Sequence, residues 1–406
     1  GLGDVYKRQL PLLHGLDVEG EIQRPVQGLI VAPTRELAIQ VARAVHQYGR
    51  HRGARVLAVY GGQSYSRQIG RLTHGVDIVV GTPGRMLDLI RKGVLDLSGV
   101  RYLVLDEADE MLSMGFIEDI EAILSETPAT RQTALFSATL PKPIRRLADH
   151  YMREPEAITI NPQRLTVAET EQRYYTVHED DKLGALTRIF EVEDINSALI
   201  FARTKLRTAE LADALLARGF QAESLHGDLN QQARETVMGR FRNGHVTLLV
   251  ATDVAARGLD IEDVSHVINY DIPFDPEAYV HRIGRTGRAG KSGIAITLIT
   301  PRERRRLQKI ESYTMQPINR AKLPTADVIH AHRDAQFLLK LGEQFEQTES
   351  HEHALVSQLF EAGYAPADIA AAAIRLARAE EQQRPIEDIR EIRPHTKAHT
   401  PREAYH

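Results

Sequence analysis

Short apolar runs alternate with amphipathic stretches along most of the chain. Each run is short and rich in aliphatic residues, as expected for strands buried on both faces of a parallel sheet. The intervening stretches, such as Arg35–Tyr48 and Met86–Lys92, carry apolar residues at helical spacing. Strands separated by helices predict βαβ units. In the first part of the chain the predicted strands are Gly28–Pro33, Val56–Gly61, Asp77–Gly81, Tyr102–Asp106 and Thr133–Ser137.

The alternation pauses at residues 161–169, which form no convincing element and are predicted to be a linker. It then restarts, and we expect a second α/β domain over residues 170–322 after a first one over residues 10–160. The strands predicted in the second domain are Arg173–Val177, Ala198–Ala202, Ala222–Leu225, Thr247–Ala251, Val267–Tyr270 and Gly293–Leu298.

The strand pattern ends near residue 325, and apolar residues then recur at helical spacing. We predict a helical module over residues 323–391, with a break between two of its helices at Gly363–Pro366. Residues 392–406 are polar and predicted to be a disordered tail. Residues 1–9 lack an initiator Met and match no element of the pattern, so we interpret them as a cloning or assembly scar.

Composition limits the classes of function. The chain has 406 residues, no cysteine and a net charge of −4, which excludes disulfides and requires any nucleic-acid contact to use a local basic face. No apolar run approaches the roughly 20 residues that span a bilayer, so we expect no membrane association and a cytoplasmic location. The histidines at 351, 353, 395 and 399 form no cluster at ligand spacing, and we expect no zinc site.

Three carboxylates follow directly on the apolar run Tyr102–Leu105. Asp106, Glu107 and Asp109 would lie at the carboxyl end of a buried strand, where open α/β sheets bind ligands. Crowded carboxylates repel one another and favour a compensating cation, most simply Mg²⁺ accompanying a phosphate. The alternative interpretation is a strand followed by a solvated acidic helix start.

Similar short polar segments follow most of the other predicted strands. Together they resemble, in order, the motifs of the DEAD-box family of ATP-dependent RNA helicases over roughly residues 10–300. The segments are Pro33–Ala38, Gly61–Gly62, Thr82–Arg85, Asp106–Asp109, Ser137–Thr139, Phe201–Thr204, His226–Asp228, Gln231 with Arg234, Ala251–Asp253, Arg257–Asp260 and His281–Arg288.

The resemblance implies an α/β fold with two tandem RecA-like parallel-sheet domains and a small C-terminal helical module. It also implies ATP and Mg²⁺ as cofactors. In the family, the residue matching Asp106 holds the metal and the residue matching Glu107 orients or deprotonates the attacking water. Those matching Arg285 and Arg288 reach the γ-phosphate from the second domain. The residues implied to meet the ribose are Gly258 and Asp260.

The resemblance further implies a coupling of nucleotide state to domain closure. The residues implied in it are Asp109, Ser137, Thr139 and His281. The three arginines and two glycines of His281–Arg288 do not suit the middle of a surface helix, so we expect a loop there.

RNA is the implied partner, held through its backbone rather than its bases. Threonines at strand-to-helix transitions, backbone N–H groups and neighbouring arginines suit phosphate oxygens, and glycines allow a backbone to approach closely. The implied action is to clamp one strand and separate a short duplex locally. The residues implied in RNA binding are Thr34, Arg35, Gly62, Thr82, Gly84, Arg85, Arg203, Thr204, Gly227, Gln231, Arg234 and Thr252.

The C-terminal module resembles the helical extension of the bacterial cold-shock-type subgroup, in which it forms a homodimer. The alternative is a helical cap on the second domain.

One departure from the family is an absent motif. The residues contain no G-x-x-x-x-G-K-[ST] segment, although Leu10–Leu13 matches the helix that should follow it. We therefore expect the chain to be truncated at its N-terminus and to hydrolyse ATP poorly, because the phosphates lack a backbone cradle and a lysine. Two further alternatives are a DNA translocase of a related branch and a non-catalytic RNA-binding clamp.

Overall fold

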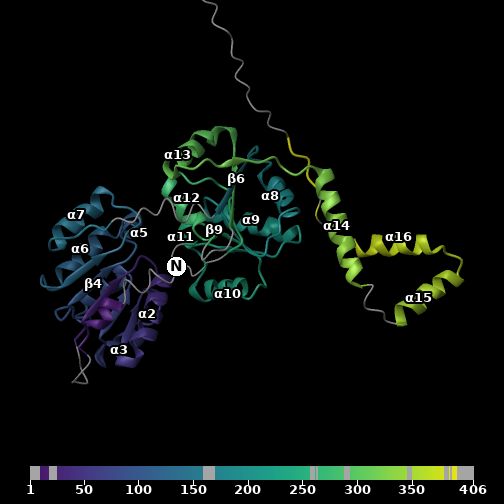
Figure 1. The fold of residues 1–406 in the computed structure, drawn as a ribbon. Coiled ribbons are helices and arrows are strands. Elements are labelled where there is room, and N and C mark those ends of the chain that lie inside the picture. Colours follow the sequence, from purple (N-terminus) through teal and green to yellow (C-terminus); the bar gives the residue numbers. More distant parts are fainter. Residues whose placement is uncertain are drawn as a thin grey trace, which may run out of the picture. The chain divides into compact units, whose positions relative to one another are not determined.

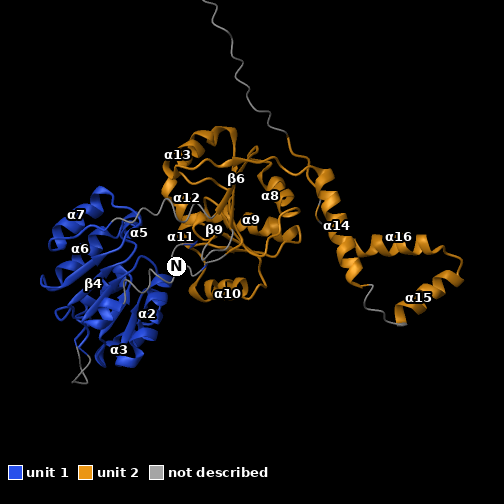
Figure 2. Cartoon of the chain, viewed as in Figure 1, with its two compact units in different colours: residues 1–161, 256–261 blue, residues 162–255, 262–406 orange. Residues whose placement is uncertain are grey.

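The computed structural model describes residues 10–17, 25–158, 170–256, 261, 264–287, 293–344, 350–378, 384 and 386–390. These fall into two compact units, one comprising residues 1–161 with 256–261 and the other residues 162–255 with 262–406 (Figure 2). The predicted scar, linker and tail lie outside the described residues.

The first unit, purple to blue in Figure 1, contains a five-stranded sheet. Its strand order is β2-β3-β1-β4-β5, and every pair is parallel. All five predicted strands are present, and their ends differ from the prediction by no more than two residues. The strands are β1 Gly28–Val31, β2 Val56–Val59, β3 Ile78–Gly81, β4 Tyr102–Leu105 and β5 Gln132–Leu135.

Helices supply the apolar cover that this sheet requires. They are α2 Arg35–Gly49, α3 Tyr65–Thr73, α4 Pro83–Arg91, α5 Ala108–Ser113, α6 Ile117–Ser125 and α7 Lys142–Tyr151. Alternate strand residues enter two different cores: Leu29 belongs to the core that contains residues of α4 and α6, whereas Ile30 belongs to the core that contains residues of α2. This alternation explains why the strands read as unbroken apolar runs.

The second unit contains a parallel sheet of seven strands, in the order β12-β6-β11-β10-β7-β9-β8. Six strands were predicted. The seventh, β12, has only two exposed polar residues and is defined by its pairing with β6, so no local pattern announces it. The strands are β6 Thr170–Thr176, β7 Ala198–Phe201, β8 Ala222–Leu225, β9 Leu248–Ala251, β10 His266–Asn269, β11 Gly293–Ile299 and β12 Asn319–Arg320.

The helices of this α/β part are α8 Lys182–Phe190, α9 Lys205–Ala217, α10 Gln231–Arg242, α11 Asp253–Ala256, α12 Pro276–Ile283 and α13 Arg304–Thr314. The expected loop at His281–Arg288 is wrong for its first three residues, which form the last turn of α12. The helix starts where the Asp275 side chain accepts a hydrogen bond from the backbone N–H of Glu277, and it ends at Gly284. Capping and proline at the first position therefore outweigh the nearby glycines.

Three helices follow, as the sequence predicted: α14 Ala326–Gln344, α15 Ser350–Glu361 and α16 Pro366–Ala377. Gly363 separates the last two with a φ of +94°, a conformation that favours glycine. The start of α14 is fixed to the α/β part, because Ile329 is fully buried and Nε of Arg333 lies 2.8 Å from Oε2 of Glu191. Among the described residues, no helix is both long and apolar enough to cross a bilayer.

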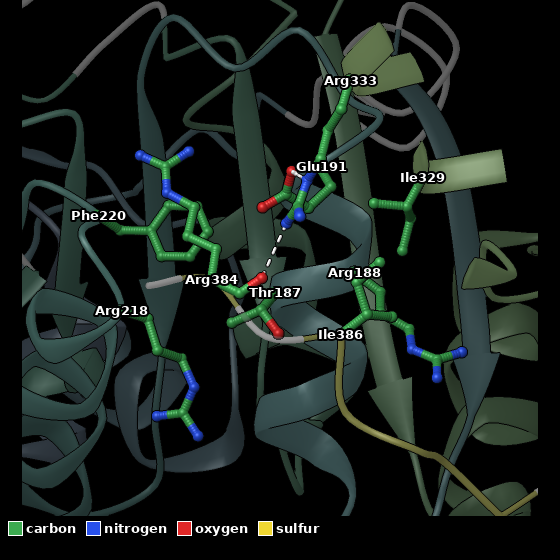
Figure 3. A pocket seen from close by; sticks show the side chains of 9 residues that line it. All are labelled: Thr187, Arg188, Glu191, Arg218, Phe220, Ile329, Arg333, Arg384 and Ile386. Carbon is green, nitrogen blue, oxygen red and sulfur yellow. Dashed lines mark hydrogen bonds and ion pairs between the residues drawn. The ribbon is translucent and has the colours of Figure 1, made fainter. Parts of the chain in front are cut away.

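The segment around residues 384–390 returns to the same surface. Arg384 and Ile386 line a pocket together with Phe220 and residues of α8 (Figure 3). The Arg384 guanidinium donates to the Gly219 carbonyl at 3.1 Å, and the Glu387 carboxylate pairs with Arg218 at 2.5 Å. The helical module is therefore held to the second sheet domain at the start of α14 and again after α16.

Candidate nucleotide and RNA site

Asp106 lies directly after β4 at the carboxyl end of the first sheet and is only 1% exposed. Its backbone N–H donates to the Val31 carbonyl at 2.9 Å, and the N–H of Ala108 donates to the Phe136 carbonyl at 3.0 Å. These bonds tie the carboxylate segment to β1 on one side and to the end of β5 on the other, so its position is set by the sheet.

Glu107 adopts a left-handed backbone conformation with a φ of +51°. A residue with a Cβ carries a cost of about 1 kcal/mol in this region, and such strain is concentrated at functional sites. The conformation lies between the strand and helix α5, so it determines where the Glu107 side chain leaves the backbone. No local pattern in the sequence predicts this conformation.

Asp109, Ser137 and Thr139 lie together and are joined by hydrogen bonds. Oδ2 of Asp109 accepts hydrogen bonds from the backbone N–H of Thr139 at 2.9 Å and from its hydroxyl at 3.1 Å. The backbone N–H of Asp109 donates to the Ser137 hydroxyl oxygen at 3.1 Å, and that hydroxyl donates to the Thr139 carbonyl at 2.5 Å. Helix α5 and the segment after β5 therefore share one bonded cluster.

The donor set around Asp106 suits a magnesium ion that arrives with a nucleotide. Among the described residues, no group of three or more His, Cys, Asp and Glu side chains could hold a metal ion by itself. Mg²⁺ typically uses one or two carboxylates and completes its shell with water and substrate phosphates. A buried carboxylate at a sheet edge fits this requirement.

Thr34 and Arg35 begin helix α2, but both already have partners within the protein. The Thr34 hydroxyl caps the helix by accepting from the N–H of Leu37 at 3.3 Å. A Cβ built on Gly62 would lie 2.4 Å from Nη1 of Arg35, and Gly62 has a φ of +84°. The guanidinium therefore occupies the space beside Gly62 that the sequence assigned to an RNA backbone, and the glycine is required by its conformation.

Thr82 and Gly84 are more open. Thr82 occupies the cap position of α4 without a side-chain cap bond, and Pro83 begins the helix. A Cβ built on Gly84 would meet nothing within 4 Å, which leaves the space that a close backbone contact needs.

Arg85 is held in place by residues that the sequence did not single out. Its Nη1 donates to Oε1 of Gln68 at 3.0 Å, and its guanidinium lies 3.9 Å from the ring centroid of Tyr65. Gln68 is 1% exposed. Burial lowers the pKa of Arg85. The sequence signal for this arrangement is a glutamine that shares a helix face with the apolar residues Tyr65, Ile69 and Leu72.

In the second unit, Arg203 and Thr204 follow β7. Thr204 caps α9 by accepting from the N–H of Arg207 at 3.2 Å. Nη2 of Arg203 donates to Oε1 of Glu303 at 3.2 Å, and the side chain remains 42% exposed.

Other RNA candidates meet near the end of β9. The Arg234 guanidinium donates to the Ala255 carbonyl at 3.2 Å, while the Thr252 hydroxyl accepts from the Ala255 N–H at 3.3 Å. Gln231 begins α10 and donates to Glu235 at 3.0 Å. A Cβ built on Gly227 would meet no atom within 4 Å.

His281 lies in the last turn of α12, and Arg285 follows the helix directly. Gly258, Asp260 and Arg288 lie outside the described residues.

Arg282, between His281 and Arg285, was not among the predicted site residues. It is 4% exposed. It forms a bidentate pair with Asp253, at 2.6 and 2.8 Å, and so joins α12 to the start of α11. In the sequence Arg282 was only one of the three arginines of the segment His281–Arg288, and no role was predicted for it.

Comparison with known families agrees with this geometry. The family model described as DEAD/DEAH box helicase matches residues 8–147, and that described as helicase conserved C-terminal domain matches residues 181–290.

Curated relatives carry the same description. The DEAD-box ATP-dependent RNA helicase CshA of Geobacillus kaustophilus is 51% identical over 327 residues, which cover 80% of this chain and 69% of that protein. The ATP-dependent RNA helicase CshA of Listeria monocytogenes is 47% identical over 394 residues, or 97% of this chain and 75% of that protein. The DEAD-box ATP-dependent RNA helicase CshA of Bacillus cereus (strain ATCC 10987) is 50% identical over 327 residues, which cover 80% of this chain and 62% of that protein.

A solved structure with the same architecture is that of Saccharomyces cerevisiae Dbp5 bound to RNA and ADP BeF3. It superposes with a TM-score of 0.72 at 31% identity and covers 84% of this chain and 87% of that one.

Proposed function

Because the chain belongs to the family of DEAD-box ATP-dependent RNA helicases, we propose that Asp106 and Glu107 carry the first half of its nucleotide site. The observation that supports this most directly is the pairing of a buried, sheet-fixed Asp106 with a strained Glu107 beside it. ATP is the substrate and Mg²⁺ its companion. When bound, the metal neutralises charge on the phosphates. The Asp106 carboxylate, at the carboxyl end of β4, would hold it.

Glu107 is the general base in this proposal. Its carboxylate orients the attacking water and accepts its proton, while the left-handed backbone keeps that carboxylate apart from the Asp106 side chain. Asp109 remains bonded to Thr139, so the segment that carries the base responds to any movement of the segment after β5.

The second half-site comes from the other unit. Arg285 and Arg288 act on the γ-phosphate, Gly258 and Asp260 meet the ribose, and His281 takes part in coupling. Guanidinium groups that approach only when two domains close can contribute a factor of about 10³ or more to turnover. Hydrolysis then requires closure, which makes the chemistry a switch for gripping RNA.

RNA is held through phosphates and 2′-hydroxyls at the ends of strands in both units. Among the described candidates, the exposed ones are Gly62, Gly84, Arg203, Thr204 and Gly227. Thr34 and Arg35 contribute through the positive end of α2 and through the arrangement of the Gly61–Gly62 turn. Contacts of this kind position a strand without reading its bases.

Strand separation and nucleotide hydrolysis test the proposal together. The assays are release of a labelled strand from a short RNA duplex and phosphate release from ATP, each with RNA and with DNA of the same sequence. Equal stimulation by both polynucleotides would favour the DNA translocase. RNA binding without any turnover, in a protein that carries a complete phosphate-binding loop, would favour the non-catalytic clamp.

The absent G-x-x-x-x-G-K-[ST] segment leads to a further proposal: these 406 residues alone hydrolyse ATP poorly. Fusing the loop-containing segment of a DEAD-box relative before residue 10 should restore turnover. Family-like turnover by the 406 residues alone would refute the proposal. A cytoplasmic location also stays a prediction.

The C-terminal helices are proposed to form a homodimer. Their described apolar side chains include several that are 40–80% exposed, namely Val328, Leu338, Leu339, Leu355, Val356, Leu359, Phe360 and Leu376. Both ends of the module are fixed to the second sheet domain. A second copy of the same helices would cover this surface.

A further inference from the structure

Lys182 is a charged residue in the interior of the second unit. It begins α8 and its side chain is 0% exposed, which is rare for lysine unless carboxylates compensate it. Nζ lies 3.1 Å from Oδ1 of Asp271, 3.1 Å from Oε2 of Glu179 and 4.0 Å from Oε2 of Glu303. Three carboxylates thus surround the buried ammonium group, and none of the roles proposed above involves this cluster.

Asp271, its main partner, is 1% exposed and follows β10. Oδ2 of Asp271 accepts a hydrogen bond from the backbone N–H of Arg203 at 2.9 Å. The backbone N–H of Asp271 donates to the carbonyl of Phe201 at 3.1 Å. Asp271 therefore holds the chain on both sides of Ala202, where β7 turns toward α9.

The Arg203 side chain is held by the same cluster. Oε1 of Glu303 accepts a hydrogen bond from the Arg203 guanidinium, while Oε2 of Glu303 faces Lys182. The guanidinium also lies 5.0 Å from the ring centroid of Phe274. Both the backbone and the side chain of Arg203 are thus bonded to carboxylates that Lys182 faces. Arg207 also pairs with Asp271, at 3.1 Å, and Arg306 with Glu303, at 3.1 Å, but Lys182 is the fully buried cation of the three.

Asp271 also contacts the segment proposed to bear on the nucleotide. Its carbonyl accepts a hydrogen bond from Nη1 of Arg282 at 2.7 Å, and the same nitrogen donates to Oδ1 of Asn269 at 2.9 Å. Arg282 lies on α12 between His281 and Arg285. One residue, Asp271, therefore bonds both to an RNA candidate and to the arginine-rich helix.

We propose that Lys182 and Asp271 act as a positioning pair that orients Arg203 for an RNA phosphate and links it mechanically to α12. The inference rests on the proposed RNA-binding role of Arg203. A pair that served only the core would affect stability alone. If the pair positions Arg203, breaking the pair removes one contact with an RNA phosphate. Each such contact contributes about one unit to the slope of log K against log salt concentration.

The test uses the full chain and a fluorescein-labelled single-stranded RNA of uridines, with affinity measured by anisotropy at several salt concentrations. Lys182→Met and Asp271→Asn should each weaken binding about tenfold and lower the salt slope by about one. Combining either change with Arg203→Ala should add little, because all three remove the same contact.

Arg333→Met is the matched control. It breaks another ion pair of the same unit, with Glu191, in which both side chains are 11% exposed and neither touches Arg203. We expect it to lower the melting temperature while leaving RNA affinity and salt slope within about twofold of the parent.

The outcomes separate the two levels of the proposal. If Arg203→Ala leaves RNA binding unchanged, the proposed RNA role of Arg203 is wrong. If Arg203→Ala weakens binding while folded Lys182→Met and Asp271→Asn do not, the positioning pair is refuted. If Lys182→Met does not fold, the isosteric Asp271→Asn tests the pair by itself. If neither variant folds, Glu303→Gln tests it, because this change weakens only the contact with the Arg203 guanidinium.

Discussion

One carboxylate oxygen of Asp109 accepts two hydrogen bonds from Thr139, at 2.9 Å from the backbone N–H and 3.1 Å from the hydroxyl. These residues are 30 positions apart in the chain and lie on segments after β4 and β5. Asp109 also belongs to the helix that follows Glu107. We therefore expect any shift of the Thr139 segment to reach the proposed base, which lies two residues before Asp109.

Thr139→Val tests this coupling. The substitution removes the hydroxyl bond and keeps the backbone bond, so we expect a stability loss of about 1 kcal/mol and a larger decrease in duplex separation than in ATP hydrolysis. Both rates are measured on a fusion that carries the G-x-x-x-x-G-K-[ST] segment of a relative before residue 10. Thr127→Val is the control, since the Thr127 hydroxyl bonds only within its own segment, to the Leu124 carbonyl. An equal decrease in both rates would argue against coupling.

Glu107→Gln in the same fusion should bind ATP and RNA normally but lose at least about 10²-fold in turnover, because the amide cannot accept a proton from water. Single-turnover phosphate release and nucleotide binding are measured side by side. Glu118→Gln, in the first turn of α6, provides a charge-matched control. Undiminished turnover in Glu107→Gln would remove Glu107 from the role of base.

Glu107→Gly should stabilise the fold while abolishing hydrolysis. Glycine adopts a φ of +51° without the steric cost of a Cβ, so the free energy of unfolding should rise by up to about 1 kcal/mol. Urea unfolding at neutral pH measures the change. Glu110→Gly, inside helix α5, should instead lower stability by about the same amount. A loss of stability in Glu107→Gly would show that the backbone is not strained.

Acid should weaken the second unit through Glu193. Interaction with His266, 3.6 Å away, lowers the pKa of the Glu193 carboxyl; burial opposes this shift, and Arg173 adds to it. A carboxyl with a depressed folded pKa stabilises the protein above its ordinary pKa, and this contribution disappears as pH falls through the folded value.

Glu193→Gln should therefore be less stable than the parent at pH 7, and the difference should shrink below about pH 4.5. Denaturant midpoints across pH 3–7 measure this. Glu126→Gln, at an exposed position, should show the same pH dependence as the parent. A constant difference between Glu193→Gln and the parent at every pH would contradict the assignment.

Leu339→Glu tests the proposed dimer. Leu339 is 64% exposed on α14, so a charge there should cost little in the monomer but disrupt an apolar interface between two copies. Light scattering after size-exclusion chromatography gives the mass. Leu216→Glu, at a leucine 59% exposed on α9, should leave the mass unchanged. A monomeric parent protein would overturn the proposal directly.

The sequence by itself determined the order of strands and helices, the parallel sheets and the sets of polar residues at strand ends. Apolar periodicity and strand-end chemistry are local properties, so the runs Tyr102–Leu105 and Ala198–Phe201 could be recognised without knowing their neighbours. The same local evidence placed Asp106 and Arg203 correctly at the ends of β4 and β7.

Only the tertiary structure decided how those residues are held. The left-handed backbone of Glu107, the Asp109–Thr139 bonds and the burial of Lys182 against Asp271, 89 positions away, have no periodic signature. A buried charge becomes tolerable only when distant partners converge on it, and that convergence depends on how sheet and helices pack. Sequence identifies the groups that carry the chemistry, whereas packing determines which of them are free to act and which hold others in place.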